Sequence, residues 1–207
     1  FRDAITGELN LGGMKIDPAK AEGFFSRVLD QYGDDSVAEL GGTAIAVENI
    51  SNILAKVIED RRIGLSPLEK SSRYVRFDRK DEQGNYPYIV DPDIDAAGHG
   101  ERYRQAMSAL FDTYVAILEP LLEGLKARFP QSEGQSAGAY AAAIRAQACD
   151  VVRYLLPMAT KTNVGLVGNG RAFEYLMYHL RACGLSEGAR IAGQIDDALS
   201  HLIPAFV

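Results

Sequence analysis

From residue 61 to residue 74 the chain reads Arg61-Arg62-Ile63-Gly64-Leu65-Ser66-Pro67-Leu68-Glu69-Lys70-Ser71-Ser72-Arg73-Tyr74. Gly64 and Pro67 interrupt regular structure, so we expect residues 61–72 to form a loop. Its cations, serine hydroxyls and backbone amides can together hold a phosphate through charge-assisted hydrogen bonds. From composition alone, a solvated polar loop is the simpler interpretation.

Hydrophobic periodicity predicts the elements on either side of this segment. Before it we expect a helix over 17–32, a strand over 43–50 and a helix over 52–60. After it we expect strands over 73–77 and 86–90, paired as a hairpin about the turn signal Gly84-Asn85. The rest of the chain is predicted as helices over 100–129 (bent at Pro120), 136–156, 170–182 and 186–203, with a strand over 160–167.

This order of elements favours an α+β fold, with a mixed or antiparallel sheet flanked by long helices, over a doubly wound α/β sheet. The 207 residues are expected to form one domain, and the start at Phe1 suggests that further residues precede it. A net charge of −6 argues against a general nucleic-acid surface, although local arginines can still bind a small anion.

Other composition features set limits on location and chemistry. No apolar run approaches the roughly 18 residues that a membrane span needs, and we expect a cytoplasmic protein. Cys149 and Cys183 lie in apolar helical contexts and are expected to be buried, reduced thiols. The three histidines lack the spacing of metal ligands, so no metal site is predicted.

Residues 61–74 resemble the signature of flavin-dependent thymidylate synthases, Arg-His-Arg-x-x-Ser-x-Asn-x-x-Ser-x-Arg-Tyr. The positions that match at the same spacing are Arg61, Ser66, Ser71, Arg73 and Tyr74. Glu69 falls where this ThyX-like family places a nucleotide-contacting glutamate. The chain departs from the signature at three positions, which are Arg62 for the histidine, Ile63 for the second arginine and Leu68 for the asparagine.

Two other regions resemble the same family, in the same order along the chain. Residues 33–40 are similar to the family's Gly-His-Glu/Ser-Thr/Ser-x-x-Glu-His segment, where Ser36 and Glu39 match and Asp34 and Leu40 replace histidines. Residues 152–157 resemble Ala-Arg-x-x-Leu-Pro, and residues 169–171 match Asn-x-Arg. The resemblance therefore extends over most of the chain from residue 17 onward.

The resemblance implies a homotetramer with FAD and dUMP at subunit interfaces. Such an enzyme transfers a methylene group from methylenetetrahydrofolate to dUMP, reduces it with hydride from the flavin, and uses NADPH to reload the flavin. The flavin then does the redox chemistry while the protein positions and polarises the reactants.

Site residues carry over position by position as implications of the resemblance. Those expected to contact FAD are Ser36, Arg61, Arg62, Ile63 (through its backbone), Asn169, Arg171 and, by stacking, Tyr175. Those expected to bind dUMP are Glu69, Ser71, Ser72, Arg73 and Arg153. Glu69, Arg153 and Arg181 are the candidate catalytic residues, although the family's arginine aligns with Leu180, and Arg181 is displaced by about 100° on a helix.

Plainer interpretations remain for several of these residues. Arg153 near a helix C-terminus and Asn169 before a helix suit dipole compensation and N-capping. Arg171 near a helix start opposes the dipole, so no stabilising role is expected for it. Two alternatives to the synthase also remain open. One is a catalytically reduced unit of this fold that acts as a structural partner or a nucleotide- or flavin-binding module. The other is a related pyrimidine-modifying flavoenzyme, such as a hydroxymethylating one.

Overall fold

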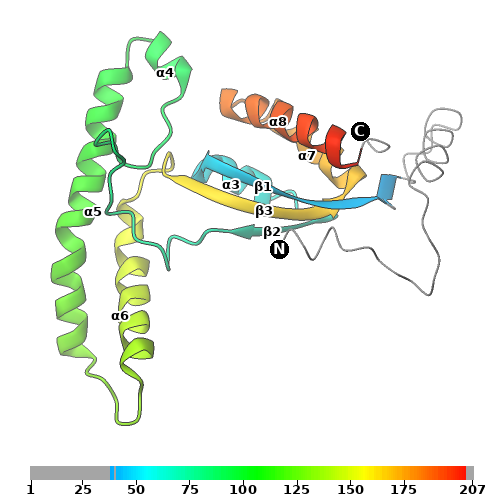
Figure 1. Ribbon diagram of the computed structural model, residues 1–207. Helices are drawn as coiled ribbons and strands as arrows, with labels where there is room; N and C mark the ends of the chain where they lie inside the picture. Colours follow the sequence, from blue (N-terminus) through cyan, green and yellow to red (C-terminus); the bar gives the residue numbers. More distant parts are fainter. Residues whose placement is uncertain (1–37, 40, 204–207) are drawn as a thin grey trace, which may run out of the picture.

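A computed structural model of the chain describes residues 38–39 and 41–203 (Figure 1). The predicted helix over 17–32 and the candidate flavin ligand Ser36 lie outside these residues. In chain order the elements are β1 (Gly42–Ser51), α3 (Asn52–Glu59), β2 (Leu65–Glu69), α4 (Pro92–Ala96), α5 (Gly100–Arg128), α6 (Ala137–Val152), the 3₁₀ turn η2 (Arg153–Leu155), β3 (Lys161–Asn169), α7 (Gly170–Ala182) and α8 (Ser186–Leu202).

The three strands form an antiparallel sheet in the order β1-β3-β2. β3 lies in the centre and pairs with β1 from Gly42↔Asn169 to Ser51↔Lys161. It pairs with β2 from Leu65↔Gly168 to Glu69↔Val164. The predicted α+β class is therefore confirmed, with an antiparallel sheet.

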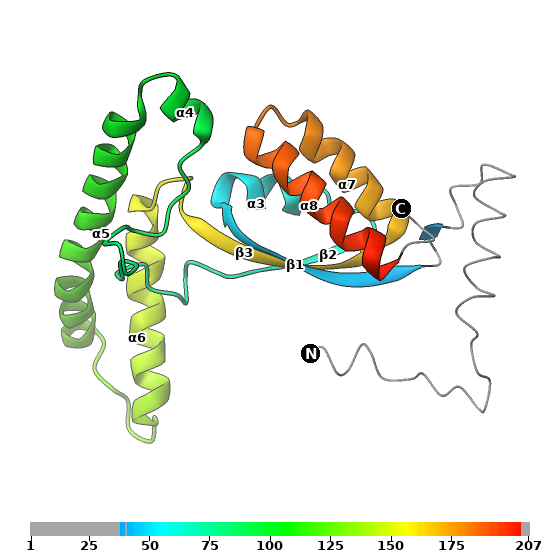
Figure 2. The ribbon, with the colours of Figure 1, turned by 45° about the horizontal axis from the view of Figure 1, so that its top comes forward.

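The helices α3, α7 and α8 all cover the same face of the sheet (Figures 1 and 2). Alternate β3 residues such as Val164 and Leu166 point into this core, as the two-residue period of a strand requires. The other face carries Leu68 and Val167, whose side chains are 78% and 54% exposed. One face of the sheet is thus buried within the chain and the other is left open to contact.

The helices α5 and α6 form an antiparallel hairpin beyond one end of the sheet (Figure 1). A second core lies between them, built around the fully buried Phe111 and Tyr114. Phe77 and Tyr86 reach this core from the segment that connects β2 to α4, and Tyr86 stacks on Phe111 with ring centroids 4.9 Å apart. The connecting segment is therefore fixed by its aromatic side chains.

Most predicted elements are confirmed, but residues 65–69 form a strand where a loop was expected. Pro67 is compatible with β2 because this strand lies at the edge of the sheet, where a missing N–H need not break a second ladder. Pro67 does disfavour a strand with neighbours on both sides, but it does not prevent an edge strand.

The predicted hairpin over 73–77 and 86–90 is wrong. Residues 72–74 form a turn, and Tyr88 makes only one isolated bridge, with Thr160. Pairing with β3 ends when the Lys70 amide donates to the Asn163 carbonyl at 2.9 Å. Beyond that point the chain leaves the sheet so that Phe77 can enter the core of the helical hairpin.

Candidate functional site

The loop that follows α3 packs tightly against the first turn of α7. Gly64 has a φ of +77°, and a Cβ at this position would lie 2.7 Å from the Cβ of Ala172. Both the left-handed backbone and the close contact require glycine. Because the next residue, Leu65, pairs with Gly168, the loop lies beside Asn169 at the end of β3.

Asn169 and Arg171 hold the start of α7. The Asn169 Oδ1 accepts from the Ala172 amide at 2.9 Å, so Asn169 is the N-cap. An Arg171 guanidinium nitrogen lies 2.9 Å from Glu39 Oε1. We expected no stabilising role for Arg171, and this ion pair gives it a small one. Because the pair is solvent-exposed and worth at most about 1 kcal/mol, a ligand can compete for the guanidinium.

Arg61 carries an unsatisfied polar atom in this region. Its Nε is buried and has no hydrogen-bond partner among the described residues. Such a group costs about 1–3 kcal/mol unless an oxygen atom of a water or ligand supplies the missing bond. Arg62 is exposed, and Ile63, which is 84% exposed, does not pack in the core.

Tyr175 lies one turn after Arg171, on the exposed side of α7. Its ring packs edge-on to His179, with centroids 4.2 Å apart, and 45% of the residue is exposed. A partly exposed aromatic ring is suited to stack on a planar group. We refer to the residues that converge here as the α7 cluster, namely Arg61, Arg62, Ile63, Asn169, Arg171 and Tyr175.

A compact turn follows the other end of β2. The Tyr74 amide donates to the Ser71 carbonyl at 3.1 Å, and the Arg73 amide donates to the Ser71 hydroxyl at 3.3 Å. Ser71 and Ser72 are half-buried while Arg73 is exposed, with its guanidinium carbon 5.8 Å from the centre of the Tyr74 ring. Hydroxyls and an exposed cation thus project from one turn.

Glu69 ends β2 just before this turn and is half-buried. Burial raises the pKa of Glu69, and the negative charge of Glu59 raises it further. The Thr162 hydroxyl, which donates to the Lys70 carbonyl at 3.2 Å, opposes that increase in pKa. Glu69 is therefore a carboxyl group that holds its proton more tightly than usual.

Arg153 lies at the junction of α6 and η2. Its Nε is 3.2 Å from Asp150 Oδ1, and its guanidinium carbon is 5.5 Å from the centre of the Tyr154 ring. The end of α6 and the start of β3 lie at the same end of the sheet (Figure 1). We refer to the residues at this end as the turn cluster, namely Glu69, Ser71, Ser72, Arg73 and Arg153.

The two clusters occupy opposite ends of β2. Lys70 lies six positions after Gly64, which corresponds to about 20 Å at the rise of a strand. Each cluster contains residues from distant parts of the chain, but one chain does not bring the two clusters together.

Arg181 belongs to neither cluster. It pairs with Asp196 of α8 at 2.8 Å, while Leu180, at the position of the family's arginine, is fully buried in the core. The side chain of Leu180 is thus unavailable to a ligand, and Arg181 is already engaged in joining two helices.

Other chemistry is limited in the part of the chain that is described. Both cysteines are free, and Cys183 is half-buried rather than buried as expected. Residues 38–39 and 41–203 contain no group of three or more His, Cys, Asp or Glu side chains placed to hold a metal ion. The same residues form no helix both long and apolar enough to cross a bilayer.

Three features of the site were missed at the level of sequence. Glu39 was noted only as a matching residue, and its pairing with Arg171 depends on chain segments 132 residues apart. Thr162 influences Glu69 because β2 pairs with β3, which was not predicted, and Glu59 at the end of α3 acts on Glu69 through its charge. No local pattern marks these contacts.

Residues 4–205 match the model of the family described as thymidylate synthase complementing protein. The chain is 44% identical over 193 residues to a UPF0159 protein of Chlamydia pneumoniae, covering 93% of this chain and 36% of the relative. It is 34% identical over 209 residues to a UPF0159 protein of Thermoplasma acidophilum, covering 91% and 42%. The chain thus spans less than half the length of these relatives.

Solved structures show the same fold. One of thymidylate synthase X from Helicobacter pylori with FAD and dUMP superposes with a TM-score of 0.55, at 16% identity, over 90% of this chain and 82% of that one. A second structure of the enzyme from that organism, also with FAD and dUMP, gives a TM-score of 0.50 at 20% identity, over 87% and 77%.

Proposed function

This chain belongs to the thymidylate synthase complementing protein family, and we propose that it methylates dUMP to dTMP with methylenetetrahydrofolate and reduced FAD. NADPH would restore the reduced flavin. The observation that carries the proposal is the buried Nε of Arg61, which has no hydrogen-bond partner among residues 38–39 and 41–203 and lies in the loop that packs at Gly64 against α7. Buried N–H donors are nearly always hydrogen-bonded, so a guanidinium donor that folding leaves without a partner is suited to bind an acceptor atom of a ligand.

The α7 cluster fits FAD. Arg61, Arg62 and Arg171 supply positive charge for its diphosphate, and Tyr175 offers a ring face for one of its planar groups. Asn169 would hold the helix start in place while its amide group contacts the cofactor. Bound FAD would supply the hydride, and these residues would orient it and exclude water.

The turn cluster fits dUMP. Ser71, Ser72 and Arg73 would bind the phosphate by hydroxyl and guanidinium donors, and Arg153 would leave Asp150 to add a second cation. Glu69 would contact the uracil. Its pKa is raised by burial and by Glu59, so a bound uracil would meet a carboxyl group that takes up a proton more readily than usual.

A complete site requires a second chain, since the two clusters lie at opposite ends of β2. A two-fold axis across the sheet would place the α7 cluster of one chain next to the turn cluster of its partner. The exposed Leu68 and Val167 offer an apolar surface for such a contact. We therefore propose a homo-oligomer, with the tetramer of the family as its expected form.

A second candidate is a unit that binds nucleotide or flavin without catalysis. The buried Leu180 and the pairing of Arg181 with Asp196 favour it, because the chain then lacks a free arginine at the family's position. For the synthase, Arg181 would have to release Asp196 and turn toward the uracil.

Two assays of the purified chain separate these candidates. A flavin absorption band after incubation with FAD is expected from the synthase and from a flavin-binding unit, and a colourless protein would remove both and leave only a unit that binds nucleotide. Tritium release from 5-tritiated dUMP, with methylenetetrahydrofolate and NADPH present, is expected only from the synthase. Flavin binding without tritium release would establish the non-catalytic unit instead.

A further inference from the structure

A hollow of about 550 Å³ opens next to the turn cluster, on the side of the helical hairpin. Its wall is formed by Tyr74, Val75, Arg76, Asp78, Arg79 and, from α6, Arg145. None of these residues was assigned to the FAD or dUMP site. Three of the six side chains are guanidinium groups, in a chain whose net charge is −6.

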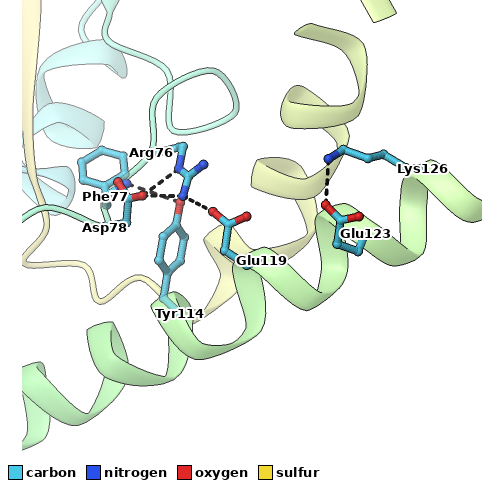
Figure 3. Close-up of polar contacts among 7 residues, drawn as sticks. All are labelled: Arg76, Phe77, Asp78, Tyr114, Glu119, Glu123 and Lys126. Atoms are coloured by element: carbon cyan, nitrogen blue, oxygen red, sulfur yellow. Dashed lines mark hydrogen bonds and ion pairs between the residues drawn. The ribbon is translucent and has the colours of Figure 1, made fainter. Parts of the chain in front are cut away.

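Arg76 forms a rigid, charge-compensated part of this wall. Its Nε donates to Asp78 Oδ2 at 2.7 Å, and a terminal nitrogen donates to Glu119 Oε1 of α5 at 2.6 Å (Figure 3). Two carboxylates therefore hold the guanidinium in place. Arg76 lines the hollow, and because two carboxylates face its single positive charge, it adds no net positive charge there.

Arg79 and Arg145 differ from Arg76 because neither has a carboxylate within 4 Å among the described residues. Both side chains are exposed. The charge of Arg145 also acts on the buried thiol of Cys149. Burial raises the pKa of the Cys149 thiol, while the charges of Arg76 and Arg145 oppose that rise. Arg79 and Arg145 line one concave surface without an ion pair to any described residue, and a bound anion would reduce the repulsion between their charges.

We propose that this hollow binds a dicarboxylate, with one carboxylate on Arg79 and the other on Arg145. A planar guanidinium matches a carboxylate through two parallel N–H donors, so carboxylates suit an arginine pair well. Tyr74 is 65% exposed and lies between this hollow and Arg73, where its ring can cover a planar group attached to the dicarboxylate.

The ligand follows from the proposed function, on which this part of the inference rests. The folate co-substrate ends in a glutamyl group with two carboxylates, joined to an aromatic ring. Its position in the hollow would direct the rest of the folate past Tyr74 toward the turn cluster. A free dicarboxylate is the other possible source of the same chemistry.

Binding of three probes to the intact chain tests the site: folic acid, pteroic acid (which lacks the glutamyl group) and glutarate. The test variant is the double substitution Arg79→Gln/Arg145→Gln, and the matched control is Arg102→Gln/Arg128→Gln, which removes two exposed charges from α5. We expect the test variant to weaken folic acid binding about tenfold, since two charge-assisted contacts are lost. Pteroic acid binding should not change.

Several results would overturn the proposal. If the control pair weakens folic acid binding equally, the effect reflects the overall charge of the chain rather than a site. If the test variant weakens pteroic acid binding as much as folic acid binding, the arginines do not contact the glutamyl group. A loss limited to glutarate would retain the dicarboxylate site and remove the folate assignment. A parallel loss of dUMP affinity would make the hollow part of the nucleotide site. Tritium release by the unsubstituted chain tests the proposed function separately.

Discussion

The Cβ of Ala172 lies 2.7 Å from the point that a Cβ on Gly64 would occupy. This contact joins the loop after α3 to the first turn of α7, two segments that are 108 residues apart (172 minus 64). It determines where Arg61 and Arg62 lie relative to Asn169 and Arg171. The geometry of the α7 cluster therefore depends on the absence of a single side chain.

Gly64→Ala should destabilise the chain and weaken FAD binding. A left-handed alanine costs about 1–2 kcal/mol, and the clash with Ala172 adds about 1–3 kcal/mol. Chemical unfolding and a flavin titration measure the two effects.

Gly84→Ala is the matched control for this substitution. Gly84 has a φ of +83°, but nothing lies within 4 Å of its Cβ position. It should therefore show only the backbone cost and an unchanged affinity for FAD. Equal losses of stability in the two variants would show that the loop does not pack on α7 as described.

Glu187→Gln should cost about 1–3 kcal/mol of unfolding free energy. The buried carboxylate accepts from the Ser51 amide at 2.9 Å and from the Ser51 hydroxyl at 2.5 Å, and it thereby attaches α8 to the β1–α3 junction. An amide satisfies only one of these buried donors, which leaves the other unpaired. Urea unfolding gives the difference.

Glu123→Gln provides the comparison, because Glu123 is exposed and, among the residues that the structure describes, pairs only with Lys126 of α5, at 2.7 Å (Figure 3). Its loss should stay below about 0.5 kcal/mol. If both substitutions cost the same, the Glu187 carboxylate contributes no more than a surface charge.

The sequence predicted the elements whose signals are local. The strand over 160–167 and the helices over 170–182 and 186–203 alternate or repeat clearly, and each appears within two residues of its predicted bounds. The residues of each cluster were named from the family motifs, and their roles stay predictions. The two predictions that were wrong, the loop over 65–69 and the hairpin that includes 73–77, depend on contacts with distant parts of the chain. Pro67 is tolerated because β2 lies at an edge of the sheet, and residues 73–77 leave the sheet because Phe77 enters the core of the helical hairpin.

Glu69→Gln should stabilise the chain at high pH and have no effect at low pH. The pKa of Glu69 is raised in the folded state above its ordinary value of 4.5, so the folded state binds the proton more tightly. The unsubstituted chain therefore loses stability as pH rises from 4.5 through the folded pKa, after which the loss is constant. Glutamine carries no charge and escapes this loss. Unfolding of both forms at pH 3 and pH 8 tests the sign, and a stability difference that is independent of pH would contradict it.

Asp196→Asn should strengthen dUMP binding if Arg181 serves the uracil. The substitution removes the carboxylate that holds Arg181 at 2.8 Å and costs less than about 1 kcal/mol of stability, since the pair is exposed. Arg181→Gln should weaken dUMP binding in the same titration. Unchanged dUMP affinity in both variants would limit Arg181 to joining α7 and α8.

The most direct test of a site shared between chains is activity in a mixture of two inactive variants. Arg73→Ala disables the turn cluster and Arg171→Ala the α7 cluster, and both side chains are exposed, so each variant should fold. The two variants are mixed, dissociated and reassembled. A site is then intact only where the α7 cluster of an Arg73→Ala chain meets the turn cluster of an Arg171→Ala chain, which random pairing gives in about a quarter of the sites. The mixture should therefore release tritium from 5-tritiated dUMP at about a quarter of the unsubstituted rate. A mixture no more active than the separate variants would contradict a site formed from the opposite ends of two sheets.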